Sequence, residues 1–555
     1  MNAITSLLVR MVARPPGWHT KLAIHTRTRD LVQSPLVTSR HSAHQARPKS
    51  SIGRECDIFN YTSGRWLRQD GQERLSRAIT FDFETLCGRL QAVCPGARSV
   101  KSFEKKEGGF NRIFIFTMEN SRQIVVKLPY TLAGPSGRNI RSEVATIKYL
   151  QRHTKIPIPS VLDWSDSASN PIGTEYIIMA HASGVLLHLK WPHMDVESQI
   201  RDGRPRIPAY GSLYSVSSLY TDSSSYLLDE GYCIGAHCGP MFWDCNPLQP
   251  RYYERVEPNH GPWPTLSAFC DGLVDTGISR VPPAGPAGPR PRYQGSSQDH
   301  YKLLDHGRAV IKKMAEDPRI QNAARPTLYH PDLHKRNVFI SEEDPTKITA
   351  FIDWQSASIE PAFWYADEVP DFAQPLAHPS REDAFEPKSE ACAKVHNICL
   401  QYFSPKLAEP RMMDESLFRP FRYCYRTWND GAPAFREELI QTARHWDELG
   451  LPQPCPYPLP TSEELEDHRK QYKQFETAQE LRFTLTNLLN TASDGWVPTK
   501  DWDATKEAHK EAYAGLLREV LKVDPTDEED TLRSEADMRE LWPFDLDDLK
   551  PSNTC

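Results

Sequence analysis

The sequence predicts an α+β protein in which a small antiparallel sheet with one helix precedes a larger, mainly helical part. The first observation is a series of short strand-like runs, separated by turn residues, between residues 100 and 180. The second is one amphipathic helix pattern among these runs, whose apolar positions are Ile140, Val144, Ile147 and Leu150. The third is the helical patterning that dominates residues 390–523. A chain of 555 residues has room for several domains of about 150 residues each.

The sheet-bearing part is assigned to residues 80–185. Its predicted strands are 100–103, 113–116, 124–128, 161–164 and 175–180. The single helix lies between the third and fourth strands and ends before Pro157, because proline has no backbone N–H to continue it.

The mainly helical part is assigned to residues 186–523, with an insertion at 191–300 that contains a Pro/Gly-rich run. Thr461 and Glu464 have the spacing of a capping box and predict that a helix begins there. A further helix is predicted from Trp502 to Val523.

The two ends of the chain differ from the middle in charge. Residues 1–54 hold nine Lys or Arg and one acidic residue, and an apolar helical pattern before Pro15. Such an Arg-rich, Ser-rich, acid-poor start is typical of a mitochondrial transit peptide, and a disordered basic leader is the alternative. Residues 524–555 hold eleven acidic residues against three basic ones, which predicts a solvated acidic tail.

Composition excludes two classes of protein. No apolar run reaches the roughly 18 to 20 residues of a bilayer span, so we expect no membrane-spanning helix. The formal net charge is −7, whereas a nucleic-acid binder would show a basic stripe and a high isoelectric point, so no nucleic-acid partner is expected.

The most informative stretch runs from Leu328 to Trp354. It contains His-x-Asp-x4-Asn, ending at Asn337, and then Asp353 between apolar neighbours. Phosphoryl transfer needs positioning and charge neutralisation. Asp332 would accept the proton of the attacking hydroxyl, while Asn337 and Asp353 would hold Mg²⁺ through oxygen atoms. Each residue alone could equally cap a turn or end a strand, but the combined pattern favours the phosphoryl-transfer interpretation.

The upstream strands supply the other half of a nucleotide site. Gly108 and Gly109 lie in a turn between two strands, where glycine permits close approach of phosphates, although such turns are common in hairpins. Lys127 ends the third strand, and Glu143 lies in the helix that follows. A strand lysine that contacts phosphates and is held by a helix glutamate is the kinase arrangement. Residues 175–182 would then connect the two parts of the molecule.

Two histidines of this loop receive structural roles. His330 is expected to orient the catalytic loop. His334 could face the phosphates, but it is expected to be an exposed loop residue.

Together these residues resemble the aminoglycoside phosphotransferase superfamily. The resemblance implies a bilobal protein-kinase-like fold with a small antiparallel-sheet N-lobe and a larger, mainly helical C-lobe. It implies ATP and Mg²⁺ as cofactors, an unidentified small-molecule hydroxyl as acceptor, and site roles for Gly108, Gly109, Lys127, Glu143, Asp332, Asn337 and Asp353. Within the superfamily, the PAYGSLY run at 208–214 and the basic leader resemble the fungal altered inheritance of mitochondria protein 9 group, which implies a mitochondrial location.

Two alternatives remain. The short, proline-bearing segment 191–208 departs from relatives, which favours a nucleotide-binding pseudokinase that supports mitochondrial maintenance through interactions. Phosphate transfer to protein is disfavoured, because the chain lacks the Asp-Phe-Gly and Ala-Pro-Glu pair that bounds a protein-kinase activation segment.

Overall fold

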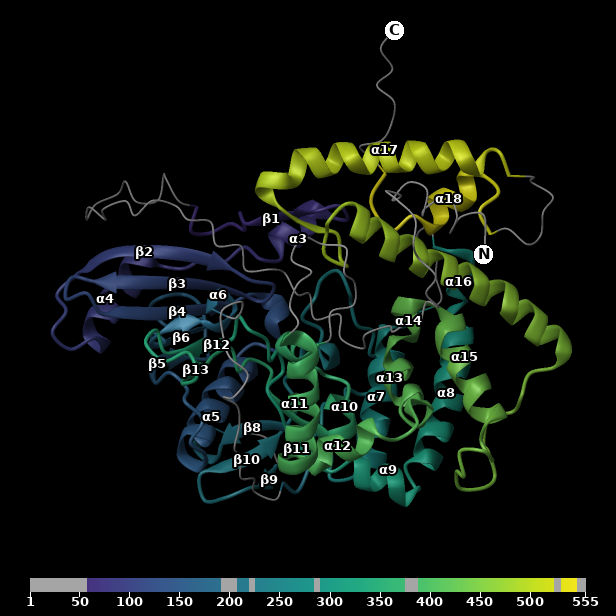
Figure 1. The fold of residues 1–555 in the computed structure, drawn as a ribbon, viewed down its shortest axis with the longest axis horizontal. Coiled ribbons are helices and arrows are strands. Elements are labelled where there is room, and N and C mark those ends of the chain that lie inside the picture. The colour runs from purple at the N-terminus through teal and green to yellow at the C-terminus, as the bar shows by residue number, and fades with distance from the viewer. Residues whose placement is uncertain are drawn as a thin grey trace, which may run out of the picture.

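The computed structural model describes residues 57–190, 207–218, 225–283, 290–374, 388–523 and 531–546. The leader 1–54 and nearly all of the 191–208 segment lie outside these residues. The described chain is α+β, with antiparallel sheets and many helices, as the sequence predicts (Figure 1).

A five-stranded antiparallel sheet forms from all five predicted strands, with the predicted helix α5 (Arg138–His153) packed against it (Figure 1). In spatial order the strands are β2 (Val100–Glu107), β3 (Asn111–Met118), β4 (Gln123–Pro129), β6 (Tyr176–Ala180) and β5 (Val161–Ser165). Residues 176–180 are therefore part of the sheet, and the connection to the next part of the molecule is shorter than predicted, from His181 to Gly184.

The two faces of this sheet bury different residues because side chains alternate along a strand. Phe114 on β3 lies opposite Val126 on β4, and both belong to a core that also includes Leu86 and Leu90 of α4 (Phe83–Val93). On the other face, Ile140 and Val144 of α5 pack against Ile177 of β6.

Two smaller sheets follow. One has the order β13-β12-β7, and the other has the order β11-β14-β8-β10-β9. Their strands are β7 (Val185–Leu186), β8 (Gly211–Ser215), β9 (Tyr226–Leu227), β10 (Tyr232–Gly235), β11 (Pro326–Leu328), β12 (Val338–Ile340), β13 (Ile348–Phe351) and β14 (Ser358–Pro361). Strands β8 and β10 come from the predicted insertion. Strand β8 pairs with β10 on one side and, on the other, with β14, which follows Asp353 in the chain.

Helices make up most of the remaining structure and enclose the largest hydrophobic core, which includes Phe269, Leu304, Phe363, Phe421 and Phe435. The helices are α6 (Leu187–Lys190), α7 (Leu266–Arg280), α8 (Ser297–Met314), α9 (Pro318–Ala323), α10 (Ala362–Tyr365), α11 (Lys388–Phe403), α12 (Pro405–Arg411), α13 (Arg419–Tyr423), α14 (Thr427–Asp430) and α15 (Ala432–Arg444).

The C-terminal helices α16 (Ser462–Leu488), α17 (Trp502–Val520) and α18 (Glu535–Leu541) form a separate hydrophobic cluster along the top of Figure 1. Thr461 and Glu464 form the predicted capping box at the start of α16. Trp542 and Phe544, from the acidic C-terminal stretch, are buried in this cluster.

An N-terminal segment, residues 57–82, joins the five-stranded sheet to the C-terminal helices. It contains β1 (Gly64–Trp66), which pairs with β15 (Trp496–Pro498) just before α17, and α3 (Asp70–Leu75). No role was predicted for this segment, because its contacts are made by residues far away in sequence.

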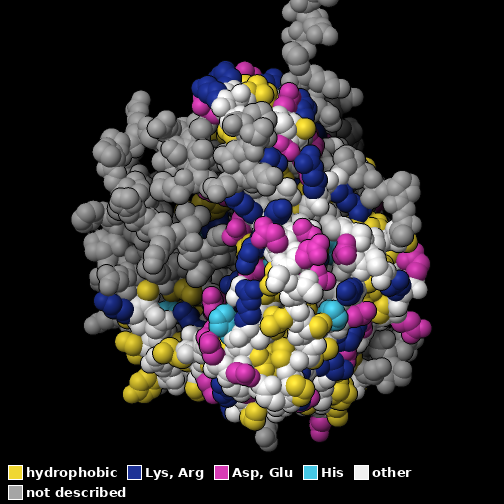
Figure 2. Space-filling model, turned by 90° about the vertical axis from the view of Figure 1, so that its right-hand side faces the viewer, with side chains coloured by type: hydrophobic (Ala, Val, Ile, Leu, Met, Phe, Trp, Pro, Cys, Tyr) yellow, Lys and Arg dark blue, Asp and Glu magenta, His cyan; other side chains and the backbone are white. Residues whose placement is uncertain are grey.

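Basic and acidic side chains are interspersed on the described surface. Figure 2 shows Lys and Arg next to Asp and Glu across the described part of the face at the right of Figure 1, where α8, α15 and α16 lie. The part of the chain that the structure describes contains no helix that is both long and apolar enough to cross a membrane.

Candidate functional site

The centre of the candidate site is Lys127 on strand β4. Its neighbours Val126 and Leu128 point into the core on the α4 side, so alternation places Lys127 on the face that α5 covers. The Lys127 Nζ atom lies 2.8 Å from Oε1 of Glu143 on α5 and 2.8 Å from Oδ1 of Asp353. The structure therefore brings together three of the residues singled out in the sequence, although they are separated by up to 226 positions.

Burial and charge act against each other in this group. Burial alone would lower the pKa of Lys127, but the carboxylates of Asp353 and Glu143 outweigh it, so its pKa is raised. Burial raises the pKa of Glu143 despite the adjacent lysine. The pKa of Asp353 is lowered, because Lys127 outweighs the effect of burial. A cationic lysine with an ionised Asp353 is the result.

Asp332 and Asn337 lie in the loop between β11 and β12. The Asn337 Nδ2 group donates to the backbone carbonyl oxygen of Asp332 at 2.9 Å and reaches its Oδ2 atom at 3.4 Å. His334 Nε2 lies 3.1 Å from the same Oδ2 atom. Among the described residues no donor contacts the Oδ1 atom of Asp332, whose side chain is 38% exposed. That oxygen is therefore accessible and can accept a proton.

His334 differs from its expected role. Its side chain is only 13% exposed, and its Nδ1 atom accepts the backbone N–H of Arg336. Burial alone would lower the pKa of His334, but the bond and charge of Asp332 outweigh it and raise the pKa. The sequence pattern gave no sign of this pairing.

His330 has the orienting role that was predicted. Its Nε2 atom is 2.9 Å from the carbonyl oxygen of Ile352, and its Nδ1 atom accepts the backbone N–H of Asp332. These two bonds fix the neutral tautomer with the proton on Nε2, and burial lowers the pKa of His330. The buried histidine thus ties the Asp332 loop to the residue before Asp353.

The hairpin of β12 and β13 brings Asn337 and Asp353 to one end, as the spacing predicts. Val338 pairs with Phe351, and the backbone N–H of Ile352 donates to the carbonyl of Asn337 at 3.0 Å. Asp353 has a φ of 64°, a left-handed conformation that is uncommon for a residue with a side chain. Strained backbone of this kind is concentrated at functional positions.

The turn with Gly108 and Gly109 lies at the same end of the sheet as Lys127, because Asn111 pairs with Pro129, two residues beyond that lysine. The Gly108 N–H donates to the carbonyl of Asn111 at 2.9 Å. Arg77 of the N-terminal segment donates through Nε to the Gly109 carbonyl at 3.2 Å. The turn is thus held from outside the sheet.

One link across the site was not predicted. The Asn111 side-chain amide donates to the Gln355 side chain, and Gln355 Nε2 donates to the Ala133 carbonyl at 3.2 Å. These contacts connect the glycine turn to the residues just after Asp353. A pair separated by 244 positions has no local sequence signature.

The donor set at Asp353 and Asn337 fits Mg²⁺. Both side chains offer oxygen, the ligand type that this hard cation prefers, and Mg²⁺ completes its shell with phosphate oxygens and water. The Asp353 side chain is 41% exposed, and within the described ranges no donor contacts its Oδ2 atom. A buried oxygen of Glu143, Oε2, also has no protein partner there.

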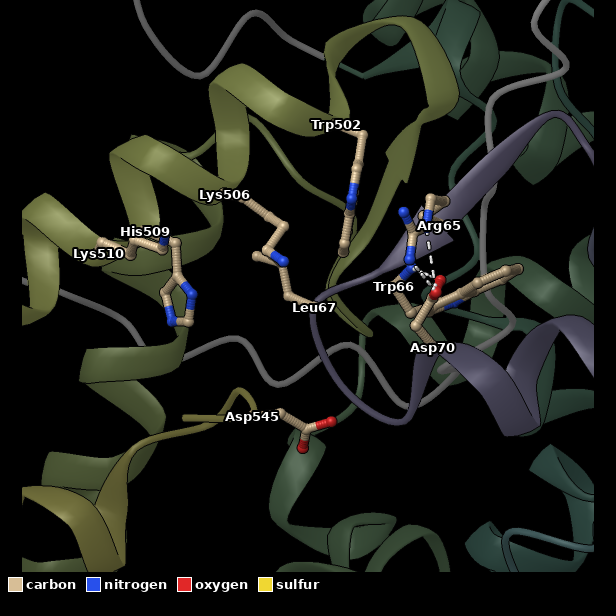
Figure 3. Close-up of a pocket in the computed structure, with 9 residues that line it drawn as sticks. All are labelled: Arg65, Trp66, Leu67, Asp70, Trp502, Lys506, His509, Lys510 and Asp545. Carbon is tan, nitrogen blue, oxygen red and sulfur yellow. Dashed lines mark hydrogen bonds and ion pairs between the residues drawn. The ribbon is translucent and has the colours of Figure 1, made fainter. Parts of the chain in front are cut away.

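A pocket elsewhere in the molecule contains none of these residues. It lies between β1, α3, α17 and Asp545, and Figure 3 shows Arg65 bonded to Asp70 at its edge. Both Lys506 and Lys510 line it together with Asp70 and Asp545, so its charges are mixed and indicate no single class of ligand.

Comparison with known proteins places the central motif in a family. Residues 282–364, which include Asp332, Asn337 and Asp353, match the model of the phosphotransferase enzyme family. The resemblance to aminoglycoside phosphotransferases and to the altered inheritance of mitochondria protein 9 group is thereby confirmed.

Curated relatives are similar over part or most of the chain. A subtelomeric hrmA-associated cluster protein from Aspergillus fumigatus is 28% identical over 332 residues, covering 50% of this chain and 63% of that protein. Altered inheritance of mitochondria protein 9 from Zygosaccharomyces rouxii is 22% identical, covering 86% of this chain and 91% of that protein. The match to the Aspergillus protein thus spans less than two thirds of its length.

A solved aminoglycoside phosphotransferase from Alicyclobacillus acidocaldarius is 11% identical to this chain, with a TM-score of 0.29. The alignment covers 72% of this chain and 99% of that structure.

Proposed function

We propose that this protein is an ATP- and Mg²⁺-dependent phosphotransferase that acts on a hydroxyl group of a small molecule. The observation that carries the proposal is the meeting of the Lys127–Glu143 pair with Asp353, next to the Asp332–Asn337 loop. Charge neutralisation and positioning, the two requirements of phosphoryl transfer, would thus be provided within one site.

Asp332 is the proposed general base. Its Oδ2 atom is held by His334 and Asn337, which leaves Oδ1 to accept the proton of the acceptor hydroxyl. Lys127 would contact nucleotide phosphates, and Glu143 would keep the lysine in position. Asn337 and Asp353 would hold Mg²⁺, which neutralises charge on the phosphate oxygens.

The five-stranded sheet and α5 would form the N-lobe, and the helical part would form the C-lobe. Residues 181–184 would then link the lobes, and the turn at Gly108 and Gly109 would lie over the phosphates. The hydrogen bond from the Arg77 side chain to the Gly109 carbonyl supports a fixed position for this turn.

A mitochondrial location is proposed from two findings. Relatives such as the Zygosaccharomyces rouxii protein are named as mitochondrial, and the basic, acid-poor stretch 1–54 has the composition of a transit peptide.

The test is nucleotide binding and turnover by the full chain and three variants. In a thermal-shift titration, ATP with Mg²⁺ at about 100 times its dissociation constant stabilises a protein by about 2.7 kcal/mol. We expect this shift in the wild type, its loss in D353N, and its retention in D344N, which changes an exposed aspartate in the turn of the same hairpin.

D332N should keep the nucleotide-induced shift but lower turnover by about 10² to 10⁴-fold in a screen of hydroxyl-bearing metabolites. Unchanged turnover would overturn the role of Asp332. A folded wild type that shows no shift with ATP and Mg²⁺ would overturn the phosphotransferase proposal and favour a protein that acts through interactions.

A further inference from the structure

Two buried arginines, Arg251 and Arg280, lie close together away from the candidate active site. Their residues are 9% and 7% exposed. Arg251 follows β10 in the insertion, and Arg280 is the last residue of α7. Both donate through Nη2 to the carbonyl oxygen of Met241, at 2.6 Å from Arg251 and 3.4 Å from Arg280. Two guanidinium groups therefore share one neutral acceptor.

Neither arginine has an anionic partner in the described part of the chain. No carboxylate there forms an ion pair with either residue, and the buried Nη1 atom of Arg251 and Nε atom of Arg280 have no acceptor. Arg426, next to this pair, differs because it binds Asp430 through two bonds of 2.9 and 3.2 Å. A buried charge normally requires such a partner.

Nearby carboxylates offset this positive charge only in part, because the charges of Asp244 near Arg251 and of Asp430 near Arg280 raise the pKa of each arginine but do not outweigh burial. Burial lowers the pKa of both arginines, and their mutual repulsion lowers that of Arg280 further, to about 9. The end of α7 contributes a partial negative charge of about one half, which is less than the two positive charges that it faces. The pair therefore forms an electropositive centre inside the protein.

Two polar aromatic residues, Trp243 and His260, lie beside Arg251. Arg251 Nε donates to the Trp243 carbonyl at 3.3 Å, and His260 stacks on the Trp243 ring at 3.6 Å between centroids. The buried Nε2 atom of His260 also lacks a partner among the described residues. Two unpartnered nitrogens, Nη1 of Arg251 and Nε2 of His260, thus belong to residues that contact Trp243.

We propose that Arg251 and Arg280 bind an oxyanion, the phosphate or carboxylate group of a small molecule. Guanidinium groups match both groups geometrically and form short, charge-assisted bonds to them. The insertion loop and α7 hold none of the proposed catalytic residues, so this site does not depend on the proposed phosphotransferase activity.

The experiment titrates the full-length protein with inorganic phosphate at constant ionic strength, using sodium chloride as the balancing salt. Thermal shift and isothermal calorimetry report binding. We expect a saturable rise in melting temperature for the wild type, and at least about a tenfold weaker affinity for R280M, equal to about 1.4 kcal/mol.

Without phosphate, R280M should be at least as stable as the wild type, because an apolar side chain replaces an unpaired buried charge. R308M is the matched control. Arg308, on α8 facing α7, binds Asp271 and Asp275 at 2.8 and 2.6 Å. Its loss should lower the melting temperature yet leave the phosphate response intact.

Sulfate and acetate distinguish the two sources of the oxyanion. A response to phosphate and sulfate alone would identify a phosphate group, and a response to acetate alone would identify a carboxylate. The proposal is overturned if no anion gives a saturable response, if R280M responds like the wild type, or if R280M is strongly destabilised without any anion response in the wild type.

Discussion

At the scale of single residues, the candidate site depends on one buried lysine between two carboxylates. Lys127 and Glu143 are buried, whereas Asp353 is partly open to solvent. The lysine offsets only part of the effect of burial on Glu143, whose pKa is still raised, and it lowers the pKa of Asp353, which leaves that carboxylate ionised for a cation. Stability and proposed function therefore depend on the same three side chains.

Replacing Lys127 should show how far the stability of the protein depends on this side chain. We expect K127M to lower the free energy of unfolding by about 3 to 5 kcal/mol at pH 7, because breaking a buried pair leaves an uncompensated charge. Without Lys127, burial and the charge of Asp353 both raise the pKa of Glu143 with nothing to oppose them, so this pKa lies further above the unfolded value than in the wild type. The variant then gains stability relative to the wild type as pH falls from 7 towards 5, since the folded state binds the extra proton.

Urea denaturation at pH 7, 6 and 5 measures the difference in unfolding free energy between the wild type and K127M. K127M with E143Q should be more stable than K127M alone at pH 7, because the unpaired carboxylate is removed. A gap that is constant with pH, together with no gain in the double variant, would contradict the interpretation.

At the scale of secondary-structure elements, α17 holds the C-terminal segment in place through His509. This side chain is 4% exposed, and its Nε2 atom accepts the Trp542 indole N–H at 2.8 Å. Burial lowers the pKa of His509 to about 4. The acceptor role requires the neutral ring, so the contact favours the unprotonated form.

The contact should make stability fall in acid. The folded pKa of about 4 is lower than the unfolded value of about 6.5, so the unfolded state binds more protons between these values. His509 therefore contributes fully at pH 7 and loses about 2 kcal/mol by pH 5. H509Q should be less stable than the wild type at pH 7, with a gap that narrows by this amount at pH 5.

Denaturation at pH 7 and pH 5 measures the difference in unfolding free energy between the wild type and H509Q. The exposed His445 provides a control. H445Q should follow the wild-type profile, because within the described residues that exposed ring bonds only to the carbonyl of Gln441, in the helix that His445 follows. A gap between wild type and H509Q that is the same at both pH values would show that His509 has no role in the acid dependence.

At the scale of the whole molecule, the N-terminal segment 57–82 joins the sheet to the C-terminal helices. Glu107 at the end of β2 accepts four bonds from Thr62 and Ser63 and also pairs with Lys105 and Arg112. Trp66 of the same segment donates to Asp494 at 2.8 Å, close to β15. Segment 57–82 therefore links the turn at Gly108 and Gly109, strand β2 and the C-terminal helices.

Glu107 should be the most sensitive point of this connection. Burial would raise its pKa, but Lys105 and Arg112 outweigh it and keep the pKa lowered. E107Q removes the charge and turns an amide NH₂ towards N–H donors, so we expect a loss of about 3 to 5 kcal/mol in unfolding free energy.

The control is E104Q, on the same strand, where Glu104 is half exposed and 3.7 Å from Lys106. E104Q should lower the unfolding free energy only slightly, because exposed ion pairs contribute less than about 1 kcal/mol. Hydrogen exchange should show faster exchange in residues 57–82 of E107Q, whereas unchanged exchange there would contradict the connection.

The sequence by itself determined the elements and the motif, because both are local. The alternation of apolar residues specified the five strands, the 3.6-residue period specified α5, and the Thr461–Glu464 spacing specified the start of α16. Asn337 and Asp353 lie at one end of a single hairpin, and Asp332 lies in the loop just before it, so short-range geometry was enough to bring the three residues together.

Only the tertiary structure decided the contacts between distant segments. The Asn111–Gln355 link, the pairing of β1 with β15 and the unpaired Arg251–Arg280 couple all join residues without a common period or spacing. Burial and charge balance depend on what surrounds a side chain in space. Local sequence patterns do not specify those neighbours, so the sequence could not reveal that the two arginines have no carboxylate partner within the described part of the chain.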